Sequence, residues 1–193
     1  MGKIEIRFQE LTNLIPKFEQ HSSSAINAAT NALVAAFKDG NKVLICGNGG
    51  SAADSQHFAA EFVNAFSRDL DRKALPAIAL TTDTSILTSI ANDFEFENVY
   101  SRQVEAYGLP GDVLIVLTTS GSSKNCLNAV KIANFIGLTT IAFTKEKGQV
   151  STQAQISIEV PSQNTQHIQE CHMLAYHVIT ELVEDALFRK AIT

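Results

Sequence analysis

Four short, uninterrupted apolar runs decide which fold class this chain can adopt. They are KVLIC (42–46), PAIAL (76–80), DVLIVL (112–117) and TTIAF (139–143). The stretches between them have the spacing of helices, near 52–66, 84–92, 98–107 and 123–136. Strands that are apolar throughout and alternate with helices are typical of a parallel sheet that helices cover on both faces.

Two further segments complete the predicted architecture. ISIEV (156–160) alternates apolar and polar residues, which indicates an edge strand, and a long amphipathic helix follows from about Thr165 to Phe188. Residues 4–39 are helical in spacing, but Pro16 and the serine run at 22–24 predict two helices rather than one. The expected fold is a flavodoxin-like, three-layer α/β/α sandwich around a mostly five-stranded parallel sheet, with N-terminal helices.

Length, charge and cysteine content narrow the classes of function. The 193 residues suit one domain (1–193), with a helical segment for oligomerisation at 1–40 and an α/β core at 41–193. A net charge of −5 excludes general attraction to nucleic acid or anionic membranes, and no apolar run is long enough to span a bilayer. Three cysteines without CxxC spacing indicate a reducing compartment, so we expect a cytoplasmic protein.

The first polar turn follows the first predicted strand, at the edge of the sheet where ligands bind in this fold class. Its sequence, GNGGSAADS (47–55), combines glycines with a helix that begins near Ser51. Glycines permit close approach of a ligand, and the first N–H groups of a helix attract phosphate. A tight turn with a serine cap would have the same sequence, so this turn alone leaves both interpretations open.

The second polar turn, TTSGSSKN (118–125), follows the third predicted strand. Five of its first six residues carry hydroxyl groups, and a helix begins directly after it. Hydroxyl donors combined with the N–H groups of a helix N-terminus suit an acceptor-rich dianion. A capping residue would explain one or two of these hydroxyls but not all five, so this turn favours phosphate binding.

Groups that could perform chemistry lie on two predicted helices. His57 and Glu61 are four residues apart, which suits a shared metal ion, an acid/base pair or an exposed polar pair. On the last helix, Gln169 and His177 can face one groove, although His177 lies in an apolar stripe where a core histidine is the common alternative. His172 competes with His177 on spacing alone.

The two turns together resemble a known family. The TSGSS turn is similar to the sugar isomerase (SIS) domain, and its pairing with CGNGGSAADSQHFAAE resembles the phosphoheptose isomerases. The resemblance continues through PAIAL, IANDFEFENVYSRQVEAYGLPGDVL and IQECHMLAYHVITELVE. It implies conversion of D-sedoheptulose 7-phosphate to D-glycero-D-manno-heptose 7-phosphate through an enediol, the first step toward the ADP-heptose of the lipopolysaccharide core.

The resemblance also implies a site and an assembly. A zinc ion would be bound by His57, Glu61, Gln169 and His177, with Glu61 as base and His177 as partner acid. The phosphate would lie in the second turn, and the whole set of substrate contacts would be Asn48, Gly49, Gly50, Ser51, Asp93, Thr118, Thr119, Ser120, Ser123 and Gln169. Without the family, Asp93 is more simply a turn aspartate. The family forms homotetramers with active sites at subunit interfaces.

Two positions depart from the family pattern. Ala65 stands where the family usually has an arginine, with Arg68 or Arg72 as conceivable substitutes, and His167 replaces an arginine before IQE. Related SIS proteins have other functions: the DnaA initiator-associating protein is a tetramer that binds the replication initiator, and others sense phosphosugars. Because the initiator-associating protein lacks counterparts of Glu61 and His177, their presence here favours an enzyme.

Overall fold

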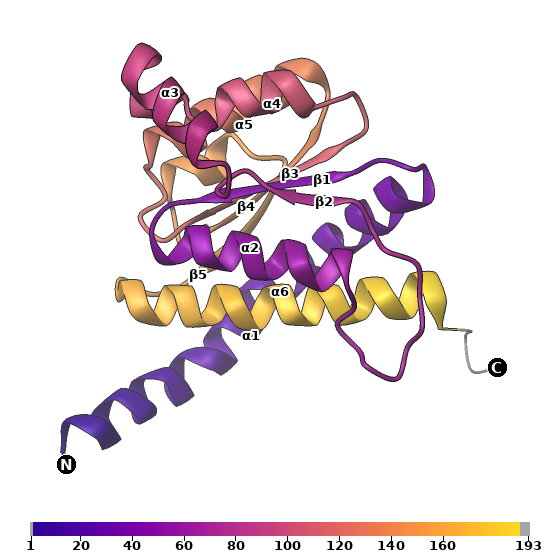
Figure 1. The fold of residues 1–193 in the computed structure, drawn as a ribbon. Coiled ribbons are helices and arrows are strands. Elements are labelled where there is room, and N and C mark those ends of the chain that lie inside the picture. The colour runs from indigo at the N-terminus through magenta and orange to yellow at the C-terminus, as the bar shows by residue number, and fades with distance from the viewer. Residues whose placement is uncertain (1, 190–193) are drawn as a thin grey trace.

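The computed structural model describes residues 2–189, which form a three-layer α/β/α sandwich (Figure 1). The central sheet is parallel and five-stranded, in the order β2-β1-β3-β4-β5. Its strands are β1 (Val43–Gly47), β2 (Ala77–Ala79), β3 (Val113–Thr118), β4 (Thr139–Lys145) and β5 (Ile156–Val160). The predicted fold class is confirmed, and β5 lies at an edge as its alternating pattern predicted.

Six helices and two short 3₁₀ helices surround the sheet in the described part of the chain. They are α1 (Lys3–Lys38), α2 (Gly50–Val63), α3 (Thr84–Phe94), η1 (Phe96–Asn98), α4 (Ser101–Tyr107), α5 (Lys124–Ile136), η2 (Gln149–Thr152) and α6 (Thr165–Phe188). Within residues 2–189, none of the helices combines the length and apolar character needed to cross a bilayer.

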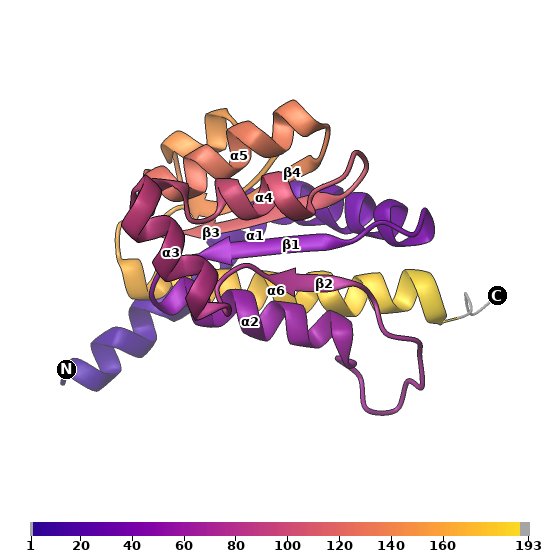
Figure 2. The ribbon, with the colours of Figure 1, turned by 45° about the horizontal axis from the view of Figure 1, so that its top comes forward.

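Side chains on opposite faces of the strands pack into two separate hydrophobic cores. Val43 and Ile45 of β1 face one core, which α1, α2 and α6 complete, whereas Leu44 and Cys46 face the other, which α4 and α5 complete. Successive side chains of a strand point to opposite faces, so strands that are apolar throughout require helices on both sides. Figure 2 shows the two helical layers, with α2 and α6 side by side beneath the sheet.

The prediction of two N-terminal helices was wrong, because α1 runs unbroken for 36 residues with Pro16 inside it. The serines do not interrupt it: Ser23 Oγ donates to Glu19 O at 2.6 Å, within the helix, and Ser22 Oγ donates to Glu159 O of β5 at 2.7 Å. Buried Leu14 and Phe18, on either side of the proline, pack into the core. This packing offsets the cost of a helical proline, about 3 kcal/mol.

Candidate active site at the α2–α6 face

The first polar turn is shaped by two glycines. Gly49 caps α2 with φ of +57°, in the left-handed region that favours glycine. A Cβ atom on Gly50 would lie 2.6 Å from Gln169 Nε2, so a side chain at this position would displace the Gln169 amide. The turn therefore serves both the helix N-terminus and the contact between the two helices.

An amide pair connects the first turn to the second. Asn48 Nδ2 donates to Asn125 Oδ1 at 2.9 Å, and Asn125 Nδ2 donates to Asn48 Oδ1 at 2.8 Å. Asn125 is in the first turn of α5, directly after TTSGSS. The two turns predicted to bind substrate are thus neighbours at the carboxyl edge of the sheet, where β1 pairs with β3.

The second turn gathers three hydroxyl groups. Thr118 Oγ1 lies 3.3 Å from Ser120 Oγ and 3.2 Å from Ser123 Oγ, and the two serine oxygens are 3.4 Å apart. Ser123 is the N-cap residue of α5, but its hydroxyl lies toward the other two instead of bonding a helix N–H. Half-buried Thr119 lies beside them. Convergent hydroxyls at a helix N-terminus are suited to bind a phosphate group.

The structure brings together His57, Glu61 and His177, although His177 is more than a hundred residues further along the chain. Their candidate ligand atoms all lie within 4.8 Å of one another. His57 Nε2 is 2.8 Å from Glu61 Oε1, and the rings of His57 and His177 are 5.1 Å apart. Burial and the nearby His57 lower the pKa of His177, against an opposing effect of Glu61, so its imidazole is neutral at pH 7.

These three donors fit a zinc ion. Two imidazole nitrogens and a carboxylate oxygen make a donor set that zinc accepts, with a fourth position for another ligand. Gln169, the fourth predicted ligand, donates through Nε2 to Asp54 Oδ2 at 2.8 Å. Because the amide nitrogen of Gln169 is hydrogen-bonded to Asp54, its amide oxygen is the atom that can contact a metal or a substrate.

Two residues of this face were missed by the sequence analysis. Asp54 is almost fully buried, and burial raises its pKa, against the opposing effects of Gln169 and His57. Its position three residues before His57, on the same side of the helix, was a usable signal. Tyr176 is fully buried and its hydroxyl lies 2.9 Å from His57 Nδ1. Its place in an apolar stripe gave no such signal.

His172, the rival of His177 on spacing, faces the core. It is fully buried, and neither ring nitrogen has a hydrogen-bond partner within residues 2–189. Burial lowers the pKa of His172 to about 4, so the ring is neutral. Its ring packs edge-on against Phe143 of β4. The structure therefore places His177, and not His172, beside His57 and Glu61, while His172 packs in the core.

Asp93 lies apart from this cluster, in the last turn of α3. It is exposed, its Oδ1 accepts from Asn92 Nδ2 at 2.7 Å, and it borders a hollow with Arg102 and Tyr107. No contact within residues 2–189 joins Asp93 to His57, Glu61 or His177.

Arg72 does not substitute for the arginine that the family has at the position of Ala65. Its side chain is fully buried, and its Nε donates to Glu184 Oε1 at 2.7 Å. The same guanidinium donates to Glu61 O at 2.7 Å and to Phe62 O at 2.9 Å, at the C-terminal end of α2. Arg72 thus supports the helix that carries Glu61.

His167, at the second departure from the family pattern, lies between two carboxylates. Its Nδ1 is 2.7 Å from Glu170 Oε2, and its Nε2 is 3.2 Å from Glu10 Oε2 of α1. The hydrogen bonds to both carboxylates, the one to Glu170 foremost, raise the pKa of His167. This residue therefore connects α6 to the N-terminal helix.

Comparisons with known proteins agree with this geometry. The SIS domain family matches residues 8–145. A phosphoheptose isomerase of Aquifex aeolicus is 48% identical over 192 residues, which is 99% of this chain and 100% of that protein. The chain belongs to the phosphoheptose isomerase family. Another family member, from Clostridium acetobutylicum, is 52% identical over 84% of this chain and 83% of its own length.

Solved structures of the phosphoheptose isomerase family have the same fold. The enzyme of Neisseria gonorrhoeae superimposes with a TM-score of 0.89 at 36% identity and covers 95% of this chain and 97% of its own. The likeness thus includes α1 and α6 as well as the segment that matches the SIS domain. The expected family membership is confirmed over nearly the whole chain.

Proposed function

We propose that this isomerase converts D-sedoheptulose 7-phosphate to D-glycero-D-manno-heptose 7-phosphate through an enediol, the first step toward the ADP-heptose of the lipopolysaccharide core. One observation carries the proposal: Glu61 and His177 lie together in a member of the phosphoheptose isomerase family. A binding protein of the SIS fold has no need of a carboxylate and a neutral imidazole at one site, whereas an isomerase that works through an enediol uses such an acid/base pair.

The chemistry requires proton transfer between neighbouring carbons. Glu61 takes a proton from C1 of the ketose, the hydroxyl proton passes from O1 to O2 in the enediolate, and the partner acid His177 supplies a proton to C2, which leaves the aldehyde at C1. Gln169 and Asn48, with Gly49, Gly50 and Ser51, would orient the sugar from the first turn. Zinc, bound by His57, Glu61, Gln169 and His177, would polarise the carbonyl and stabilise the negative charge of the enediolate.

The phosphate group is assigned to the second turn in this proposal. The three converging hydroxyls of Thr118, Ser120 and Ser123 support it, together with Thr119 and the N–H groups that begin α5. Asn48 contacts Asn125 at the same helix start, and Gln169 approaches Gly50, so a continuous series of contacts connects the phosphate turn to Gln169. Asp93 remains a proposed contact to the sugar hydroxyls.

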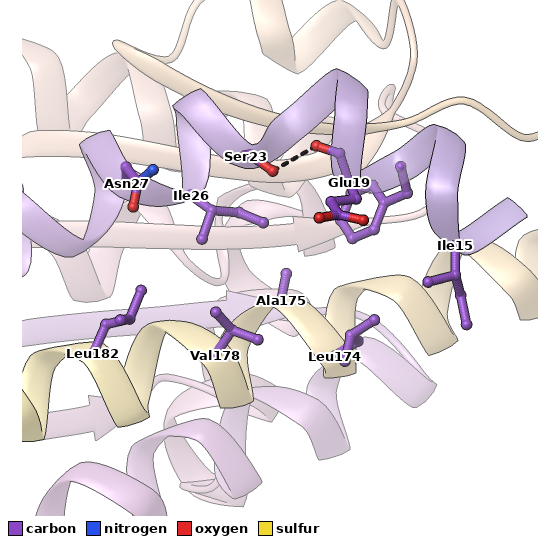
Figure 3. A pocket seen from close by; sticks show the side chains of 10 residues that line it. Ile15, Glu19, Ser23, Ile26, Asn27, Leu174, Ala175, Val178 and Leu182 are labelled. Carbon is purple, nitrogen blue, oxygen red and sulfur yellow. Dashed lines mark hydrogen bonds between the residues drawn. The ribbon is translucent and has the colours of Figure 1, made fainter.

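The proposal includes a homotetramer. Apolar side chains line a groove between α1 and α6 with a volume of about 340 Å³ (Figure 3), among them Ile15, Leu174, Val178 and Leu182. These four side chains are 36–42% exposed, and a second copy of the chain would remove them from water. Since Val178 follows His177, the assembly surface and the active site share a helix. Light scattering after gel filtration tests this: a monomer at micromolar concentration would contradict it.

We also propose a single functional domain, in which residues 1–40 serve assembly and residues 41–193 carry the site, and a cytoplasmic location. The location is supported by the three buried cysteines, which are free thiols as in proteins of reducing compartments.

A direct assay tests the activity. The purified protein is incubated with sedoheptulose 7-phosphate, with added zinc in one sample and a chelator in another, and the aldose is followed by NMR. We expect conversion with zinc and a loss of rate with chelator. A folded protein that converts nothing in either sample would contradict the proposal and favour a binding role.

A further inference from the structure

Tyr176 packs against both histidines of the site. Its ring centroid is 5.5 Å from that of His57 and 4.8 Å from that of His177, and both histidines meet it edge-on. The tyrosine ring also stacks on Phe58, with centroids 4.9 Å apart and planes inclined by 19°. The residue is fully buried, so packing fixes its position independently of its hydroxyl group.

The tyrosine hydroxyl and the glutamate bind opposite nitrogens of the same ring. Tyr176 Oη is 2.9 Å from His57 Nδ1, while Glu61 Oε1 is 2.8 Å from His57 Nε2. A carboxylate accepts hydrogen bonds only, so Nε2 of a neutral His57 carries the proton. Nδ1 is then unprotonated, and the Tyr176 hydroxyl donates to it.

Metal binding at Nε2 would reverse this arrangement. When His57 Nε2 gives its lone pair to a metal, the proton of the neutral ring must lie on Nδ1. The Tyr176 hydroxyl can then accept from Nδ1–H without moving, because a hydroxyl both donates and accepts. A carbonyl or a carboxylate in its place could serve only the metal-bound tautomer.

We propose that Tyr176 is a positioning residue for His57, which holds the imidazole ring in one orientation in both tautomers and so raises the affinity of the His57–Glu61–His177 site for zinc. The inference rests on the proposed metal site. Partners of this kind typically contribute 10–100-fold to metal affinity, about the effect expected here.

Replacing Tyr176 with phenylalanine tests the proposal, because Tyr176→Phe keeps the ring and its stacking on Phe58. Zinc affinity is measured by competition with a chromophoric chelator, and we expect it to weaken about 10-fold or more. The control is Thr180→Val, which removes another buried hydroxyl one turn further along α6, where Thr180 Oγ1 bonds Tyr176 O. The control should bind zinc as the unaltered protein does. Equal affinity in a folded Tyr176→Phe protein would overturn the proposal.

A second measurement does not depend on how the variant folds. In the unaltered, metal-free protein labelled with ¹⁵N-histidine, NMR should find the His57 proton on Nε2, and added zinc should move it to Nδ1. A metal-free ring protonated on Nδ1 would overturn the proposal, as would a protein that takes up no zinc. If the inference about Tyr176 fails but the protein still isomerises its substrate in the presence of a chelator, the proposed function stands and only the proposed metal site is wrong.

Discussion

At the scale of single residues, Glu61 carries the sharpest prediction. Its side chain is only 17% exposed and contacts His57, yet an amide of the same shape could occupy its place. Glu61→Gln should therefore fold and bind sedoheptulose 7-phosphate, while kcat falls by a factor of about 10³ or more because an amide accepts no proton. The NMR assay at saturating zinc measures the rate, and calorimetry measures substrate binding.

The matched control for this change is Glu181→Gln, which removes an exposed carboxylate from α6. It should leave the rate unchanged. Full activity in Glu61→Gln would remove Glu61 from the role of base.

We predict that buried His172 makes the folded protein less stable in acid. Burial lowers its folded-state pKa to about 4, while the unfolded chain has the ordinary histidine pKa of about 6.5. Between these two pKa values the unfolded state binds more protons than the folded state. The stability that comes from keeping His172 neutral is therefore complete above about pH 6.5 and is lost as the pH falls toward 4. The contribution of His172 to the free energy of unfolding should therefore be about 2 kcal/mol smaller at pH 4.5 than at pH 7. Urea unfolding at pH 7 and pH 4.5 measures it, and His172→Leu should show a smaller difference; an equal difference would contradict the assignment.

Residue spacing identified some of these groups and not others. His57 and Glu61 share a helix face by their spacing alone. Spacing could not choose between His172 and His177, because it does not tell which side of α6 meets the sheet and which side meets α2. Tyr176 has two functions, as a core side chain and as a polar partner of His57, and an apolar stripe in a sequence indicates only the first.

At the scale of elements, a buried ion pair fixes the end of α2. Arg72 and Glu184 are at most 1% exposed, and Glu184 also accepts from the backbone N–H groups of Phe66 and Ser67. Arg72→Ala would leave the Glu184 carboxylate buried without its partner, which costs about 3 kcal/mol or more. We expect that loss in the free energy of unfolding, measured in urea at pH 7.

The control pair lies on the surface. Arg102 and Glu105 are roughly half exposed, so Arg102→Ala should cost no more than about 0.5 kcal/mol. Similar losses in Arg72→Ala and Arg102→Ala would show that the buried pair does not stabilise α2.

The elements themselves were predictable where periodicity extended over many residues. Strands β1, β3 and β4 each contain a continuous apolar run and were predicted close to their observed bounds, since they are buried on both faces. The failure was α1, where a proline and a run of serines suggested a break. Local preferences of this kind are outweighed by tertiary packing, here against β5 and α6, which sequence periodicity does not reveal.

At the scale of the whole molecule, the contact between α2 and α6 forms the candidate site. Tyr176 and His57 are 119 positions apart, and nothing in the spacing along the chain predicts that their helices lie side by side. The expected grouping of His57, Glu61 and His177 came from the family resemblance instead. Hydrophobic patterns predict which faces are buried, but they do not specify which helix lies next to which in a layer.

The last prediction concerns the proposed contact between subunits. Leu182 lines the groove between α1 and α6, so Leu182→Glu would place a charge in the proposed contact between subunits. Burying an unpaired charge is costly, so we expect light scattering to find smaller species than the proposed tetramer. Because the proposed active sites lie at subunit interfaces, the isomerase rate should fall even though His57, Glu61 and His177 are unaltered. The matched control is Phe135→Glu, which changes an 88% exposed apolar residue on α5, in the other helical layer. A tetramer that survives Leu182→Glu but not Phe135→Glu would move the subunit contact to the opposite face.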